Sequence, residues 1–376
     1  MHLDELLTGL QKRKGSDLYL TADSPPLFRV DGATVPVEEK SWSATEVESV
    51  IRNVLSPVES ETFDRTNELN AARVVNGVGR FRLSVFRQRG QVGLVARLIP
   101  IDFPDAAMLG LPDSLLDLIM QKRGLILITG ATGSGKSTTL AALIAHRNAH
   151  TRGHILTIED PIEFVHPHKG CVITQREVGV DTASFATGLK SALRQAPDVI
   201  LIGEMRELET VEAAIHFAET GHLVLGTLHA NNANQAVERL MNFFPNEAHA
   251  QMYQQLGLNL RGIVSQRLLP RASGPGRVAA IEVMMNSPRI ADLISKGEIV
   301  GLKVAIEANA QDGSRSFDQA LYDLFRRGEI TLDEALRQAD SANNLRIKIK
   351  MEDAGQGAAD KPTFSLKQRE EPEPGW

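Results

Sequence analysis

The segment with the clearest chemical signature runs from Leu125 to Thr138 and reads LILITGATGSGKST. Four apolar residues precede a glycine-rich loop and a helix-forming segment follows it, so the pattern G-x-x-x-x-G-K-[ST] occurs in its strand–loop–helix context. The glycines allow backbone conformations in which successive N–H groups converge on phosphate oxygens, and the N-terminus of the following helix adds a partial positive charge there. The segment therefore predicts a site for a nucleoside triphosphate.

Roles within this segment follow from its chemistry. Lys136 is expected to reach the β- and γ-phosphates, and Ser137 is expected to hold Mg²⁺. The sequence contains no Asn-Lys-x-Asp signature for guanine, so ATP is the expected nucleotide. The predicted nucleotide-binding residues are Gly130, Ala131, Thr132, Gly133, Ser134, Gly135, Lys136, Ser137 and Thr138.

Acidic residues follow a second apolar run, Ile155–Ile158. Pro161 ends this predicted strand. Glu159, Asp160 and Glu163 are then expected in a loop at the carboxyl edge of a parallel sheet, where ligands bind in such folds. One of the three carboxylates could polarise the attacking water as a general base.

Two later apolar runs also end in residues suited to the same site. Val199–Ile202 is followed by Glu204, at the position of an acid that holds the Mg²⁺ shell through water. Leu223–Leu228 is followed by His229, which we expect to sense the γ-phosphate. Two arginines that could act as charge clamps flank the first run, namely Arg194 and Arg206.

Bulk composition limits the class of protein. A chain of 376 residues exceeds one ordinary core, and 42% hydrophobic with 23% charged residues is typical of a soluble globular protein. No apolar run reaches the length of a membrane span, and the N-terminus lacks the apolar stretch of a signal peptide. The single cysteine, Cys171, excludes a disulfide framework and a cysteine-based zinc site. A net charge of −6 argues against nucleic acid as a partner, and we expect a cytoplasmic protein.

Four regions are predicted along the chain. Residues 1–100 are expected to form a small α+β domain, and residues 101–112 a proline-punctuated linker. Strand and helix signals alternate from residue 113 to about residue 270, which indicates an α/β fold with a parallel sheet, and helices complete this domain up to residue 350. Residues 351–376 carry six acidic and three basic side chains, a net charge of −3, and are expected to form a disordered acidic tail.

Individual elements are also predicted. The first domain shows helix patterns over residues 3–10 and 44–54 and strand patterns over 17–20, 27–30, 79–86 and 92–99. The pair Asp31-Gly32 predicts a hairpin turn. In the second domain, Asp113 is expected to cap a helix that ends at Gly124, and Gly328 to end a later helix. Residues Thr331–Glu334 form a capping box for the helix after it.

Several of these segments together resemble the secretion-type ATPase superfamily and, within it, the type IV pilus retraction ATPases of the PilT/PilU family. The likeness covers residues 3–350, and its core motifs are Gly130–Thr138, Ile158–Phe164, Val199–Arg206 and Gly226–Asn231. It implies a RecA-like P-loop ATPase core, a smaller PAS-like N-terminal domain and a hexameric ring with each nucleotide between the two domains.

The resemblance also implies roles for single residues. Glu163 matches the catalytic carboxylate, and Glu204 matches the Walker B acid, which holds Mg²⁺ through water together with Ser137. His229 matches the residue of the family's histidine box. Two arginines of the N-terminal domain match the fingers that act on the phosphates, namely Arg82 and Arg97.

The C-terminal segments Ser316–Leu321 and Ala339–Arg346 are similar to the PilU branch of the family. This likeness implies an ATP- and Mg²⁺-dependent motor, or motor subunit, for pilus retraction and twitching motility. The implied partners are further copies of the chain, PilT-like motor subunits and a platform protein at the cytoplasmic face of the inner membrane.

Other functions remain open at this point. A pilus assembly or type II secretion ATPase has the same fold, but those relatives usually carry a tetracysteine metal site, which one cysteine cannot build. A weakly catalytic, nucleotide-binding accessory of a PilT motor is the second alternative. A nucleic-acid translocase is disfavoured by the acidic balance and by the lack of a basic, aromatic-rich stripe.

Overall fold

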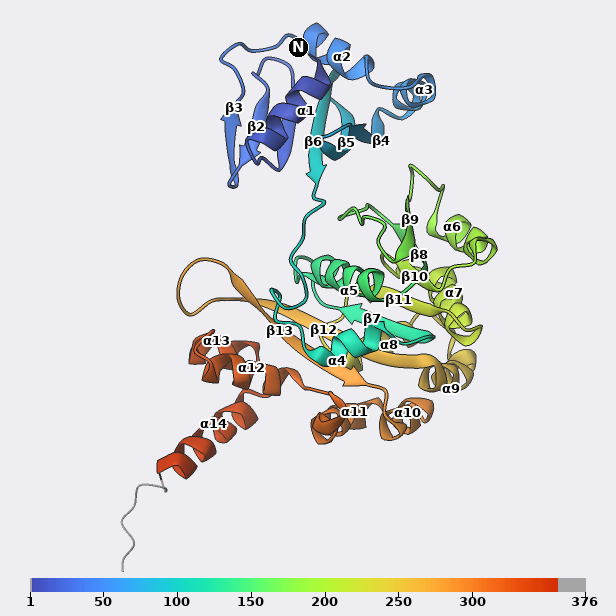
Figure 1. Cartoon of the computed structure of the whole chain (residues 1–376), viewed down its shortest axis with the longest axis vertical. Coiled ribbons are helices and arrows are strands. Elements are labelled where there is room, and N and C mark those ends of the chain that lie inside the picture. The colour runs from blue at the N-terminus through green and yellow to red at the C-terminus, as the bar shows by residue number, and fades with distance from the viewer. Residues whose placement is uncertain (1, 358–376) are drawn as a thin grey trace, which may run out of the picture.

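The computed structural model describes residues 2–357, and two separate β-sheets organise them (Figure 1). The first sheet is antiparallel, with six strands in the order β3-β2-β1-β6-β5-β4. Its strands are β1 (Asp17–Leu20), β2 (Leu27–Val30), β3 (Ala33–Pro36), β4 (Glu68–Val75), β5 (Gly79–Gln88) and β6 (Gln91–Ile99).

Helices cover one face of this sheet because its strands alternate between buried and exposed side chains. Phe81, Leu83 and Val85 of β5 are buried, whereas the residues between them are only partly so. The covering helices are α1 (Leu3–Lys12), α2 (Ala44–Arg52) and α3 (Pro57–Thr66). The two helices and four strands predicted for this region are thus confirmed. The turn at Asp31-Gly32 joins β2 to β3, a strand that was not predicted.

The second sheet has seven strands in the order β13-β12-β7-β11-β10-β8-β9. All neighbours are parallel except β12 and β13, which confirms the predicted α/β fold with a parallel sheet. Its strands are β7 (Gly124–Thr129), β8 (Gly153–Glu159), β9 (Cys171–Glu177), β10 (Val199–Ile202), β11 (Leu223–Leu228), β12 (Leu260–Pro270) and β13 (Arg277–Met285).

Helices cover both faces of this second sheet. Strand β7 lies inside it and is buried throughout, which explains its continuous apolar run. Leu125 and Leu127 lie on one side, in a core cluster that also contains residues of α6 (Phe185–Ala192), α7 (Leu208–Glu219), α8 (Ala233–Met241), α9 (His249–Asn259), α10 (Pro288–Ser295) and α11 (Leu302–Ala308). Ile126 and Ile128 pack on the other side, against α4 (Asp113–Ile119) and α5 (Lys136–His150).

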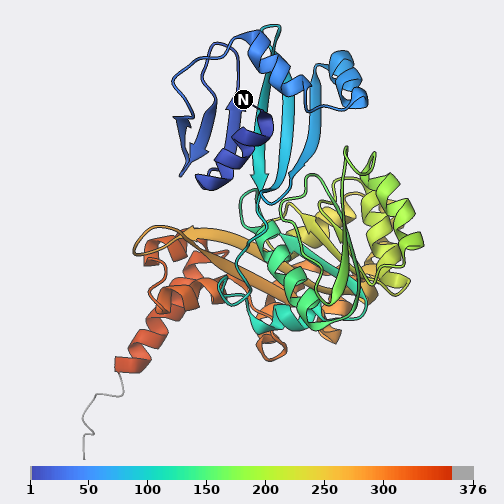
Figure 2. The same ribbon diagram turned by 45° about the horizontal axis from the view of Figure 1, so that its top comes forward.

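Three C-terminal helices pack beside β12 and β13 and complete the domain that contains the second sheet. They are α12 (Phe317–Arg326), α13 (Leu332–Gln338) and α14 (Ala342–Gly357). Gly328, with φ of 70°, follows the end of α12 as predicted. The Thr331 hydroxyl accepts the N–H of Glu334 at the start of α13. Figure 2 shows α14 projecting away from the rest of this domain.

Three boundary predictions are wrong. Pro112, not Asp113, is the N-cap of α4, and this helix ends at Ile119. Gly124, which was predicted to end the helix, belongs to β7, where its N–H bonds to the carbonyl of His222. Helix α14 continues to Gly357, seven residues into the segment predicted to be disordered. The remainder of the predicted tail, residues 358–376, lies outside the described residues. Within residues 2–357, no helix combines the length and apolar character needed to cross a bilayer.

Candidate nucleotide-binding site

A cavity of about 500 Å³ lies where β7, β8, β10 and β11 end. Residues from the loop before α5, from the loop after β8 and from the ends of β10 and β11 line it. The carboxyl edge of a parallel sheet is where such folds bind ligands, because the connecting loops converge there. The second sheet therefore brings the separate sequence motifs to one place.

The loop between β7 and α5 needs glycine at two points. A side chain at Gly130 would meet the carbonyl oxygen of Gln266 at 2.5 Å, and φ of Gly130 is +149°. Gly135 has φ of +91° and is the N-cap of α5. The helix therefore starts with its free N–H groups directed toward the loop, which favours a bound anion.

The predicted loop residues lie along two adjoining cavities. Those lining the main cavity are Thr132, Gly133, Gly135, Lys136, Ser137 and Thr138. Gly130, Ala131 and Ser134 line the second cavity, of about 580 Å³, together with Thr132 and Gly133. The hydroxyl of Ser134 is buried without a hydrogen-bond partner among the described residues. An unpaired polar group in a phosphate loop fits a ligand that accepts or donates hydrogen bonds there.

Lys136 lies folded onto its own loop. Its Nζ donates to the carbonyl oxygens of Gly130 at 2.9 Å and Ala131 at 3.1 Å. Burial lowers the pKa of the ammonium, and the carboxylates of Glu204 and Glu163 oppose this effect. The site thus holds a partly desolvated cation for phosphate oxygens beside two acids that suit Mg²⁺ and water.

Glu204, which follows β10, lies between two basic groups. Its Oε2 accepts Arg206 Nη2 at 2.6 Å, and its Oε1 lies 2.8 Å from His229 Nε2. Burial alone would raise the pKa of Glu204, but the hydrogen bond from Arg206 and the nearby positive charges outweigh it and lower that pKa. All three residues line the cavity, whereas the other predicted clamp, Arg194, does not.

The three acids at the end of β8 and in the loop after it all line the cavity, but their environments differ. Glu159, which was predicted in the loop, is the last residue of β8. The side chain of Glu163 is exposed. Burial raises the pKa of Glu159, whose carboxylate accepts Thr157 Oγ1 at 2.6 Å and Gln175 Nε2 at 3.2 Å. Glu159 is thus held by internal hydrogen bonds, and Glu163 is free to meet a ligand.

The residues of the cavity fit an Mg²⁺ ion that has few protein ligands and keeps most of its water ligands. Ser137 and Glu204 both line the cavity, and the lowered pKa of Glu204 keeps its carboxylate ionised at neutral pH. No group of three or more histidine, cysteine or acidic side chains arranged for a metal occurs within residues 2–357. Mg²⁺ commonly keeps several waters and uses one or two protein ligands plus substrate phosphates.

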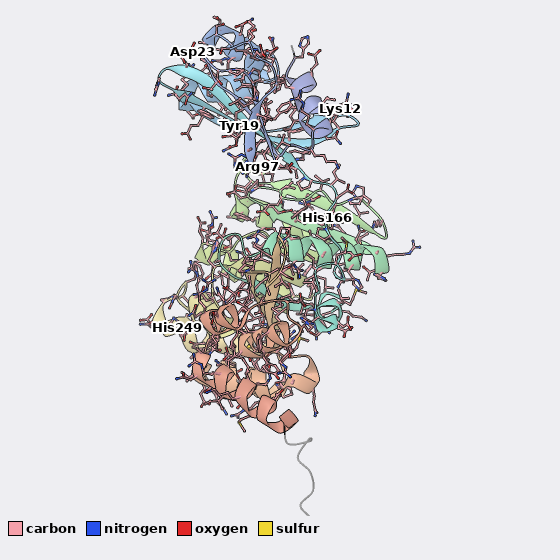
Figure 3. The ribbon with its side chains drawn as sticks, turned by 90° about the vertical axis from the view of Figure 1, so that its left-hand side faces the viewer. Lys12, Tyr19, Asp23, Arg97, His166 and His249 are labelled. Atoms are coloured by element: carbon pink, nitrogen blue, oxygen red, sulfur yellow. The ribbon has the colours of Figure 1, made fainter. Side chains whose placement is uncertain are left out.

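The two predicted arginine fingers lie outside this cavity in the single chain. Arg82 on β5 and Arg97 on β6 are directly opposed across the strands. Arg97 Nε donates to Asp17 Oδ1 at 2.7 Å, and the Arg97 side chain is 65% exposed. Figure 3 shows Arg97 at the end of the first sheet that faces the second domain, which contains His166. Within residues 2–357, the guanidinium of Arg82 forms no ion pair.

Sequence reasoning missed three polar residues of the site region. Thr227 Oγ1 donates to the carbonyl oxygen of Gly203 at 2.5 Å and so joins the ends of β11 and β10. Arg277, at the start of β13, lines both cavities. Gln175 of β9 contacts the loop that carries Glu163. Thr227 lies within the motif Gly226–Asn231 but was given no role from the sequence, and the strand order is what brings Arg277 and Gln175 to the site region.

Comparison with known proteins finds relatives that match most of the chain, and they belong to the family that the sequence motifs resemble. A family model described as "Type II/IV secretion system protein" matches residues 95–285. The type IV pilus ATPase PilU of Pseudomonas aeruginosa is 50% identical over 351 residues, which cover 93% of this chain and 92% of PilU. The type IV pilus ATPase PilT of the same organism is 40% identical over 345 residues, which cover 92% of this chain and 100% of PilT.

Solved structures agree with these relatives. The crystal structure of the pilus retraction motor PilT with bound ADP has a TM-score of 0.84 and 40% identity, and the match covers 91% of this chain and 98% of that one. The ATPase DotB of Legionella pneumophila has a TM-score of 0.77 and 26% identity, with 93% and 95% covered. The chain therefore belongs to the type II/IV secretion system protein family and, within it, to the PilT/PilU group of type IV pilus ATPases.

Proposed function

We propose that this chain hydrolyses ATP as a subunit of a hexameric motor that powers type IV pilus retraction and twitching motility. The observation that carries the proposal is the cavity, which gathers Lys136, Glu163, Glu204 and His229 from four separate segments. The likeness to PilU over 93% of the chain supports the biological role. The likeness to PilT solved with ADP supports a nucleotide as the ligand.

Each residue has a chemical task in this proposal. The loop before α5 and Lys136 bind the phosphates. Ser137 directly, and Glu204 through water, would hold Mg²⁺, which supplies charge neutralisation at the phosphates when bound. Glu163 accepts a proton from the attacking water as that water approaches the γ-phosphate. His229, next to Glu204, senses whether the γ-phosphate is present.

A ring accounts for the position of the predicted fingers. Arg82 and Arg97 lie on the N-terminal sheet and do not line the cavity of their own chain. In a hexamer, the N-terminal domain of one subunit can bring these guanidinium groups to a nucleotide held by another. Light scattering of the purified chain with ATP and Mg²⁺ should therefore give six subunits, and a monomer with full ATPase activity would contradict the ring.

The proposed setting is the cytoplasmic face of the inner membrane, with a pilus platform protein and PilT-like motor subunits as partners. No nucleic-acid partner is proposed, because the net charge is −6. An assembly or secretion ATPase is the less favoured alternative, because the single cysteine of the sequence, Cys171, is buried and cannot form a tetracysteine site. An accessory role beside a PilT-like motor is the second alternative.

Pilus retraction in living cells tests the proposal. Retraction is measured with this gene deleted, alone and together with any PilT-like neighbour gene, and with the gene restored as wild type or as Glu163→Gln. We expect wild type, but not Glu163→Gln, to restore full retraction. Restoration by Glu163→Gln would contradict an ATP-driven role. In a strain whose sole retraction ATPase is this protein, vigorous retraction would favour an autonomous motor over an accessory.

A further inference from the structure

The loop that carries Glu163 has no regular structure of its own. Residues 160–170 connect β8 to β9 without forming a helix or strand, and residues 160–166 are the first part of this connection. The side chain of Glu163 is exposed and takes part in no side-chain hydrogen bond or ion pair within the described chain. Its position at the cavity is therefore set by the main chain of the loop and by whatever holds that main chain.

Gln175 holds this main chain from the side of the sheet. Its Oε1 accepts the N–H of His166 at 2.8 Å, and its Nε2 donates to the carbonyl oxygen of Phe164 at 2.9 Å. The same Nε2 also donates to Glu159 Oε1 at 3.2 Å. Strand β9 fixes Gln175 because it pairs in register with β8, where Gln175 lies beside Thr157.

Glu159, four residues before Glu163, belongs to the same network. The Glu159 carboxylate accepts hydrogen bonds from Thr157 and Gln175. Gln175 thus bonds on both sides of Glu163, to Glu159 before it and to Phe164 and His166 after it. Bonds on both sides of one residue restrict its main chain far more than a single contact would.

The loop also contacts the segment that links the first sheet to the second, at Pro100 and Phe103. The ring of Phe103 meets the rings of Phe164 and His166 edge to face, at centroid distances of 5.4 and 5.2 Å. The N–H of Val165 donates to the carbonyl of Pro100 at 3.3 Å. These contacts lie on a segment outside the sheet, whereas the hydrogen bonds of Gln175 tie the loop to the strands.

We propose that Gln175 is a positioning residue for the hydrolytic reaction: its amide fixes the loop 160–166 so that Glu163 faces the γ-phosphate of bound ATP. The inference rests on the function proposed above, with Glu163 as the proton acceptor. An amide is required because it supplies a donor and an acceptor on one group. Gln175 itself does not line the nucleotide cavity, so it acts through Glu163 and not on the substrate.

The first test replaces Gln175 with methionine, which has a similar length but lacks the amide. For Gln175→Met in the full chain we expect kcat for ATP hydrolysis to fall roughly 10–100-fold, because a small misplacement of a catalytic group has such an effect. The KM for ATP and the affinity for ADP should stay within about twofold of wild type, since the phosphate loop is unchanged. Gln195→Met is the matched control, because within residues 2–357 the Gln195 amide bonds only to Ser191, and it should hydrolyse ATP at the wild-type rate.

The second test uses Gln175→Glu, which has the same shape as the native side chain. At neutral pH its carboxylate accepts but cannot donate, and it faces Glu159. Protonation restores one donor, and proximity to a second buried acid raises the pKa at which this happens. The ratio of its kcat to that of wild type should therefore increase as the pH is lowered from about 8.5 to about 5.5, whereas the ratio for Gln175→Met should stay constant.

The outcomes separate this inference from the proposed function. A wild-type rate for Gln175→Met, or a pH-independent ratio for Gln175→Glu, would overturn the positioning role while leaving the ATPase intact. An equal loss of ADP affinity and of kcat would also overturn it, because it would indicate general damage to the site. Absence of hydrolysis by the wild-type hexamer would instead refute the proposed function.

Discussion

His229 Nε2 lies 2.8 Å from Glu204 Oε1, so the residues that follow β11 and β10 meet directly at the nucleotide cavity. Thr227 and Gly203 join the same two strand ends through a second hydrogen bond. A change at the γ-phosphate that moves His229 must therefore also affect the acid expected to organise Mg²⁺. This contact makes the two strand ends one functional unit.

Glu204 gives a prediction for the pH dependence of stability. Its pKa is lowered in the folded chain, so the folded state binds a proton less readily than the unfolded state. The stability it contributes is present above the ordinary carboxyl pKa and is lost as the pH falls through the lowered value. Glu204→Gln should therefore lower the free energy of unfolding at pH 7, and the difference from wild type should shrink toward about pH 3.5. Urea unfolding measures this, with the exposed Glu209→Gln as the control; a constant difference at every pH would refute the assignment.

Lys136 should be required for nucleotide binding. Its ammonium is the point charge for the β- and γ-phosphates, and charge-assisted hydrogen bonds are the strong ones. Lys136→Ala should weaken ATP binding by at least about 10²-fold. Calorimetric titration with ATP and Mg²⁺ checks this, and Lys122→Ala, at an exposed position, is the matched control. Wild-type affinity in Lys136→Ala would remove the basis for the site.

The two N-terminal arginines should affect hydrolysis without affecting binding by the phosphate loop. Arg82→Ala and Arg97→Ala should each reduce the rate, by up to roughly 10³–10⁵-fold if they act on developing phosphate charge. Arg65→Ala, an exposed arginine of α3, is the control and should leave the rate unchanged. Steady-state phosphate release by the hexamer is the readout. Unchanged rates in both finger variants would make Arg82 and Arg97 surface residues without a catalytic role.

Periodic segments of the fold could be predicted, and segments whose pattern depends on packing could not. Strand β5 alternates strictly, so its buried face was evident from the sequence. Helix α3 buries only Phe63 and has no apolar stripe, although Ser56 and Glu59 form a capping box that signals its start. Strand β13 contains the buried Glu282, which breaks the apolar run and accepts the N–H of Ala233 at 2.7 Å.

The same limit applies to the candidate site. Lys136, Glu204 and His229 follow apolar runs that end at one sheet edge, so the sequence predicts that they meet. Gln175 could not be assigned, because its role depends on the register between β9 and β8. Arg82 and Arg97 stay predictions, because a single chain does not bring them to the cavity.

The rate of ATP hydrolysis by the purified hexamer, wild type against Glu163→Gln, tests the central claim most directly. The variant keeps the size of the side chain but removes the proton acceptor, so ADP and ATP binding should be unchanged while turnover falls roughly 10²–10⁴-fold. Glu209→Gln, on the exposed face of α7, should match wild type. Turnover by Glu163→Gln at the wild-type rate would contradict the account and would make Asp160, the other accessible acid of the loop, the candidate for the base.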